Sequence, residues 1–181
     1  ISGGRAAWNV VTSSNPKAAL NFNRDEHLEH EFRYQRANEF VDVVRGLWDC
    51  WDDGAIVADK DSGRFIDDSK VRPLHHKGRF FQVKGPVNIA RCPQGHPVII
   101  QAGGSPTGLE LAARTADIVF SVVQDLPSAK AAYADLKGRM GQYGRSPDAL
   151  TVLQGVMPII GRSDAEARET LAKLQAWLTP T

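Results

Sequence analysis

Residues 98–108 read Val-Ile-Ile-Gln-Ala-Gly-Gly-Ser-Pro-Thr-Gly, and this stretch decides the fold. Its apolar start is typical of a buried strand, and residues 109–114 have the apolar spacing of a helix. The two glycines allow a tight turn and leave room for a group to approach the backbone. Ser105 is a suitable helix cap, and Pro106 suits the first helical turn. The stretch therefore predicts a strand, a glycine turn and the start of a helix.

The same turn is a candidate anion site. The first N–H groups of a helix have no partner within the helix, and the helix dipole places partial positive charge at that end. Our hypothesis is that a phosphate group binds at residues 101–108. A capped helix without a ligand explains these residues as well, so the local pattern leaves both interpretations open.

The composition indicates an ordinary globular domain. The 181 residues are 42% hydrophobic and 24% charged, with a net charge of +1, so neither a nucleic-acid partner nor an acidic membrane surface is expected. No apolar run approaches membrane-spanning length, and no signal peptide opens the chain. Cys50 and Cys92 match neither a metal-ligand spacing nor a disulfide framework, which predicts a reducing, cytoplasmic setting.

Strand and helix patterns alternate along the chain. Strands are predicted at residues 6–12, 98–102, 117–123 and 151–160, where Gly155 and Pro158 interrupt the last. Helices are predicted at about 26–51, 106–115, 127–143 and, opened by a capping box at Ser163, through Trp177. This alternation predicts about four βα units with a parallel sheet and right-handed crossovers.

Four units are half of a (βα)8 TIM barrel, which has eight strands and about 250 residues. The chain opens at Ile1 without a methionine, and it stops at Thr179-Pro180-Thr181 just after a predicted helix. We therefore expect residues 1–181 to be the central to C-terminal portion of a single TIM-barrel domain from a longer protein. The fold class predicted is α/β.

Residues 52–94 interrupt the alternation. They contain a polar turn at 59–63 and a pattern at 75–86 that predicts a hairpin. A segment of this length without a clear helix is more than a connection, so we expect an insertion that serves as a lid or a subunit contact. His75 and His76 are adjacent, so on a strand they point to opposite faces, and no third ligand is spaced to help. No metal site is predicted.

His30 and Tyr34 lie four residues apart, on one face of the first predicted helix, for which Asp25 is the expected cap. The pattern by itself favours a surface helix with a packed tyrosine.

Segments throughout the chain resemble those of the flavin-dependent monooxygenases of the bacterial-luciferase-like superfamily. The branch that matches best contains the nitrilotriacetate, EDTA and dibenzothiophene-sulfone monooxygenases. The matching segments follow that family's order and spacing. They are residues 2–5, 8–13, 21–22, 30–34, 39–40, 47–51 (with Cys50 where serine is usual), 76–81, 93–98, 101–105 and 155–159.

The resemblance implies a TIM barrel that uses O2 and reduced FMN (FMNH2) supplied by a separate NAD(P)H:flavin reductase. It implies a small organic substrate that is oxygenated, with C–N or C–S cleavage, and a homo-oligomeric protein. In such enzymes the flavin carries the chemistry while the protein binds, orients and excludes water. No catalytic base is identified.

The resemblance also implies which residues bind the cofactor. Asn9, Val11 and Thr12 would lie beside the isoalloxazine ring. His30 and Tyr34 would reach the phosphate or the ribityl chain. The residues implied around the phosphate are Ala102, Gly103, Gly104 and Ser105. Position 104 departs from the family, in which many members have serine or alanine there.

Three alternatives stay open. The chain could belong to another TIM-barrel enzyme, such as an isomerase or aldolase, that binds a phosphorylated substrate at the same turn. It could belong to a non-catalytic relative that only binds flavin or a partner protein. As half of a barrel, it could also be an inactive folding module.

Overall fold

A four-stranded parallel sheet organises the computed structural model, which describes residues 2–178. The strand order is β1-β4-β5-β6, and every pairing is parallel, as predicted. The four strands are β1 (Ala7–Asn9), β4 (Val98–Gln101), β5 (Ile118–Ser121) and β6 (Thr151–Gln154). The two ends discussed above, Ile1 and residues 179–181, lie outside the described residues.

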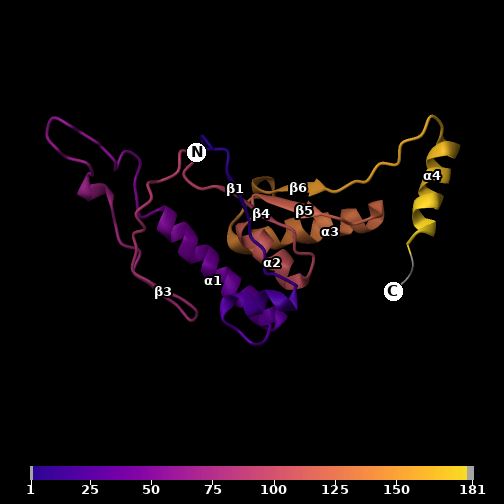
Figure 1. Ribbon diagram of the computed structural model, residues 1–181, viewed down its shortest axis with the longest axis horizontal. Coiled ribbons are helices and arrows are strands. Elements are labelled where there is room, and N and C mark those ends of the chain that lie inside the picture. Colours follow the sequence, from indigo (N-terminus) through magenta and orange to yellow (C-terminus); the bar gives the residue numbers. More distant parts are fainter. Residues whose placement is uncertain (1, 179–181) are drawn as a thin grey trace.

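A helix follows each strand of this sheet, so the four predicted βα units are confirmed (Figure 1). The helices are α1 (His30–Trp48), α2 (Pro106–Thr115), α3 (Leu126–Arg139) and α4 (Asp164–Ala176). Short 3-10 helices lie at Pro16–Phe22, Asp68–Lys70, Met140–Tyr143 and Pro147–Ala149. None of the helices in the described part of the chain is long and apolar enough to cross a membrane.

The core lies between the sheet and helices α1, α2 and α3. One cluster joins α1, α2, β1 and β4, and contains Val10, Tyr34, Val41, Ile99 and Leu111. A second cluster joins α2, β5 and α3, and includes Ala112, Val119, Leu136 and Met140. On the opposite side of the sheet, the paired residues Phe120 and Leu153 remain exposed. The sheet is therefore covered on one side, as the wall of a barrel is covered by its outer helices.

Two predicted boundaries were wrong. Helix α1 begins at His30, and Asp25 does not cap it; the preceding residue, Glu29, makes no capping side-chain bond. Residues 23–29 are mainly polar, with Leu28 as the one apolar side chain among them, so they offer too narrow an apolar face to extend the helix. Strand β6 ends at Gln154 where a strand to residue 160 was predicted, and Gly155 and Pro158 both lie beyond it.

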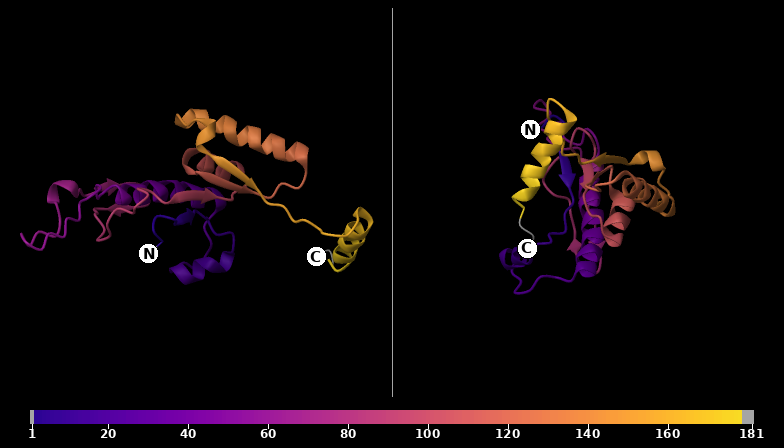
Figure 2. Two further views of the ribbon diagram at one scale, coloured as in Figure 1. Left: turned by 90° about the horizontal axis from the view of Figure 1, so that it is seen from above. Right: turned by 90° about the vertical axis from the view of Figure 1, so that its right-hand side faces the viewer.

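Helix α4 stands apart from the sheet at the end of an extended arm, residues 155–162 (Figures 1 and 2). The predicted cap of this helix is confirmed, because the Ser163 hydroxyl accepts a hydrogen bond from the Glu166 N–H at 3.3 Å. The Glu166 carboxylate accepts from the backbone N–H of Arg162, one residue before the cap. The local sequence thus supplies the N-terminal cap of this helix.

The segment 52–94 packs along α1 and contains the predicted hairpin, with Phe80 against Phe32 and Arg79 bonded to Gln35 in the first half of the helix. Strands β2 (His76–Lys77) and β3 (Gln82–Val83) are antiparallel. A small core of Cys50, Trp51 and Ala55 holds the segment to the end of α1, and the Trp51 indole donates to the Val87 carbonyl at 2.8 Å.

Glu39 ties this hairpin to α1. Its carboxylate accepts hydrogen bonds from the backbone N–H groups of Phe80 and Phe81 and from His76 Nε2–H at 3.0 Å. Burial alone would raise the pKa of the Glu39 carboxyl. The hydrogen bonds from His76, Phe80 and Phe81 outweigh burial, so the pKa lies below its usual value of 4.5.

This lowered pKa predicts a pH-dependent contribution to stability. A carboxyl whose pKa is lower in the folded state stabilises the fold above its unfolded pKa, and the effect is lost as pH falls through the folded-state pKa. The melting temperature of the natural protein should exceed that of Glu39→Gln near neutral pH, and the difference should shrink below pH 4.5. Thermal unfolding followed by circular dichroism, at a series of pH values from acidic to neutral, measures this difference in melting temperature. Glu169→Gln on exposed α4 is the control, and an equal pH dependence in both variants would contradict the prediction.

Arg145 closes the carboxyl end of α2. Its guanidinium donates to the carbonyl oxygens of Ala113 (2.8 Å), Ala116 (2.6 Å) and Ala149 (3.1 Å). Burial lowers the pKa of this guanidinium from its usual value. One side chain thus satisfies carbonyls that the end of a helix leaves without partners.

Arg145→Met should therefore destabilise the fold by about 1–3 kcal/mol, because it leaves half-buried carbonyls unpaired. Urea unfolding followed by circular dichroism measures the loss. Arg162→Met is the matched control: this side chain is 93% exposed, and the free energy of unfolding should change by less than about 0.5 kcal/mol. Equal effects of the two substitutions would show that the carbonyl contacts of Arg145 contribute nothing.

Candidate functional site

The carboxyl ends of β1 and β4 meet at one edge of the sheet. Asn9 pairs with Ile100, and the Val10 N–H donates to the Ile100 carbonyl at 2.9 Å. The residues that follow, 10–12 after β1 and 102–105 after β4, therefore leave the sheet side by side. Asn9, Val11 and Thr12, predicted from the first strand, are thus brought to the same edge as the glycine turn, with Asn9 and Val11 exposed.

The glycine turn has unpaired donors. Ser105 caps α2, because its hydroxyl accepts from the Gly108 N–H at 3.2 Å, and Pro106 occupies the first helical turn as predicted. The backbone N–H groups of residues 102–105 donate to no acceptor within residues 2–178. These donors lie at the positive end of the α2 dipole.

Tyr34 faces this turn from α1. Its side chain is only 8% exposed and packs with Val10, Ile99 and Leu111. A Cβ added at Gly103 would lie 2.8 Å from the Tyr34 hydroxyl oxygen, so this hydroxyl touches the turn. Within the described residues the hydroxyl makes no hydrogen bond. It is therefore a further free donor at the same place.

His30 lies one turn earlier on the same face of α1 and is exposed. The centroids of the His30 and Tyr34 rings are 4.8 Å apart. The structure thus groups His30, Tyr34 and the glycine turn, which the sequence separates by about 70 residues.

The two glycines of the turn differ. At Gly103 an added Cβ would meet Tyr34 Oη at 2.8 Å and the Gly108 Cα at 3.2 Å. At Gly104 nothing lies within 4 Å of an added Cβ. Of these two glycines, Gly103 is therefore the one required for the close approach, and position 104 has room for a side chain.

Gln101 lies within the stretch 101–108 but was not among the residues predicted to bind the cofactor, and it is buried at the centre of this arrangement, with 2% of its surface exposed. Its side-chain Nε2 donates to the Val10 carbonyl at 2.7 Å and so joins the ends of β4 and β1. The sequence did contain a signal, since Gln101 is a polar residue that continues an apolar strand.

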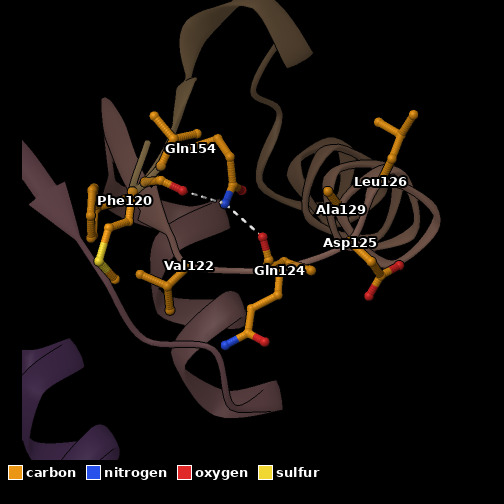
Figure 3. Close-up of a pocket in the computed structure, with 11 residues that line it drawn as sticks. Phe120, Val122, Gln124, Asp125, Leu126, Ala129 and Gln154 are labelled. Atoms are coloured by element: carbon orange, nitrogen blue, oxygen red, sulfur yellow. Dashed lines mark hydrogen bonds between the residues drawn. The ribbon is translucent and has the colours of Figure 1, made fainter. Parts of the chain in front are cut away.

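A hollow lies at the same edge of the sheet, beyond β5 and β6 (Figure 3). It has a volume of about 780 Å³. Gln154 Nε2 crosses it to the carbonyls of Val123 (2.8 Å) and Gly155 (3.0 Å). Its walls are mainly apolar: Phe120, Val122, Leu126, Ala129, Val156 and Met157.

The two adjacent histidines are not placed as a pair of metal ligands. His76 bonds to Glu39, and His75 has a positive φ of 53° in the turn before β2. In residues 2–178, no three His, Cys, Asp or Glu side chains are placed to hold a metal ion.

The chemistry of the turn is that of an anion site. Free N–H groups, a helix dipole and a phenol hydroxyl all suit phosphate oxygens, which accept hydrogen bonds and carry negative charge. Among the described residues around the turn, no paired acid and base are placed for proton transfer. The arrangement is therefore suited to bind an anion.

Comparison with known proteins identifies the family. Residues 1–180 match the family described as luciferase-like monooxygenase. The chain belongs to this family. The resemblance predicted from the sequence segments is confirmed.

Its relatives include nitrilotriacetate monooxygenase component A of Aminobacter aminovorans, 51% identical over 96% of this chain and 39% of that protein. N-acetyl-S-(2-succino)cysteine monooxygenase of Bacillus subtilis (strain 168) is 46% identical over 100% of this chain and 41% of that protein. The crystal structure of a long-chain alkane monooxygenase superposes with a TM-score of 0.90 at 39% identity, covering 98% of this chain and 41% of that one. The chain thus spans about two fifths of the length of these relatives and forms part of a TIM barrel, as predicted.

Substitutions at the two glycines test the geometry of the turn. Gly103→Ala should lower the free energy of unfolding by about 1–3 kcal/mol, because the new methyl group displaces Tyr34 or the start of α2. Gly104→Ala should be neutral or stabilise by up to about 1 kcal/mol, because the site is open and the backbone is not left-handed. Urea unfolding of both variants measures these changes in the free energy of unfolding. The geometry is wrong if Gly104→Ala is the more damaging.

Proposed function

We propose that this chain forms the flavin-phosphate half of an FMNH2-dependent, two-component monooxygenase. The observation that supports the proposal most is the set of unpaired N–H groups at residues 102–105, with the free Tyr34 hydroxyl beside them. This set suits the 5′-phosphate of FMN. The proposal also rests on membership of the luciferase-like family.

Within this proposal, each predicted residue has a role that its place permits. Residues Ala102, Gly103, Gly104 and Ser105 bind the phosphate through backbone N–H groups. His30 and Tyr34 bind the phosphate or the ribityl chain. Asn9, Val11 and Thr12 lie along the neighbouring strand end, where they contact the isoalloxazine ring.

Bound reduced FMN supplies the activation of O2. The residues of this chain bind and orient the flavin, and the apolar walls beyond β5 and β6 keep water from the reacting centre. We further propose a separate NAD(P)H:flavin reductase as partner, a small organic substrate cleaved at a C–N or C–S bond, a homo-oligomeric assembly and a cytoplasmic location. Residues 1–181 would be one portion of a single barrel domain, with the insertion at 52–94 as a lid or subunit contact.

A second candidate function follows from the same turn. Its donors suit any phosphate monoester, so a TIM-barrel enzyme acting on a phosphorylated substrate would use the same residues. Binding of oxidised FMN to the full-length protein separates these two candidate functions. It is measured by the quenching of flavin fluorescence. O2 consumption that depends on FMN and a flavin reductase then distinguishes an enzyme from a non-catalytic flavin-binding protein.

Ser105→Asp tests the phosphate position without removing the helix cap, because aspartate caps helices about as well as serine. The new carboxylate would lie next to the phosphate, so FMN affinity should fall by about 100-fold through like-charge repulsion. Fluorescence titration measures it.

Ser163→Asp at the cap of α4 is the matched control and should leave FMN affinity unchanged. The phosphate is not at this turn if Ser105→Asp binds FMN as tightly as the natural protein.

A further inference from the structure

The backbone ladder between β1 and β4 stops one step before the glycine turn. After the Val10 N–H has bonded to the Ile100 carbonyl, the next hydrogen bond of a regular parallel ladder would join the Ala102 N–H to the Val10 carbonyl. That bond is not formed. The Val10 carbonyl accepts from the side-chain amide of Gln101 at 2.7 Å instead.

This exchange has two physical consequences. The Val10 carbonyl is satisfied, although it lies at a buried position where an unpaired oxygen is costly. The Ala102 N–H is left without an acceptor among the described residues, at the start of the turn that holds the other free donors. The strand ends stay joined while one backbone donor is released.

We propose that Gln101 is a positioning residue for the phosphate site. Its side-chain amide takes the place of the last backbone bond between β4 and β1, and thereby keeps the Ala102 N–H available to a phosphate oxygen. Gln101 does not touch the ligand. This inference rests on the proposed function, since it assigns the mechanism by which the chain prepares the FMN phosphate site.

Without the amide donor, the Val10 carbonyl would be buried and unpaired. The nearest free donor in the ladder is the Ala102 N–H, so the two groups would close on each other. One donor to the phosphate would then be lost, and the glycine turn would shift toward β1. Affinity for the phosphate group would therefore fall, while contacts with the rest of the ligand would remain.

The test compares FMN with riboflavin, which lacks the phosphate, in the full-length protein. The ratio of the two dissociation constants isolates the phosphate contribution. Gln101→Met keeps the length of the side chain but removes the donor, and it should reduce the preference for FMN over riboflavin about tenfold. A general loss of stability would weaken the binding of both ligands equally and leave the ratio of dissociation constants unchanged.

Thr115→Val is the matched control. Like Gln101, Thr115 is a buried polar residue, and its hydroxyl donates to the Leu111 carbonyl at 2.6 Å, at the far end of α2. Its substitution also removes one buried donor, so it should lower the melting temperature without changing the ratio. Gln101→Asn, which is one methylene too short to reach Val10, decides the matter if Gln101→Met does not fold.

The outcomes separate the two claims. If the natural protein has no preference for FMN over riboflavin, the proposed phosphate site is wrong, and the inference with it. If the natural protein prefers FMN and the Gln101 variants keep that preference, the site stands and the role of Gln101 is refuted. A reduced preference in the Gln101 variants alone supports the inference.

Discussion

The pairing of β1 with β4 is the constraint on which the candidate site depends. Val10 and Gln101, 91 positions apart in the sequence, meet through one hydrogen bond at the edge of the sheet. Because parallel strands end at the same edge, this pairing alone brings Asn9, Val11 and Thr12 beside the glycine turn. The geometry of such a site therefore depends on how firmly the long segment between β1 and β4 is held in place.

That connection is held at several points. Arg114 of α2 donates to the Asp42 carboxylate (2.9 Å) and the Asn38 side chain (2.9 Å), so α1 and α2 are fixed to each other. At the end of α1, the Asp49 carboxylate accepts from Arg91 at 2.6 Å and from His96 at 2.8 Å, just before β4 begins. These bonds fix the position of α1, and therefore the place of Tyr34 against the turn.

Strands and helices contribute different groups to the candidate site. The strand ends present small residues and exposed backbone, and α1 presents a buried ring whose hydroxyl reaches the turn. Neutral donors suit a phosphate that must be recognised with its attached group in a fixed orientation, because each hydrogen bond has a direction. The mainly apolar hollow beyond β5 and β6 lies farther along the same edge, apart from the candidate anion site.

The sequence by itself determined the four βα units, the cap at Ser105 and the glycine turn, because strand and helix periodicity and capping chemistry are local. Resemblance to the family then named the candidate cofactor residues. Only the tertiary structure decided that Gly103 and not Gly104 is sterically required, since the cause is Tyr34 on another helix. It also decided the hydrogen-bond partner of Gln101 and the short β6, because partners from distant strands are not encoded in local pattern.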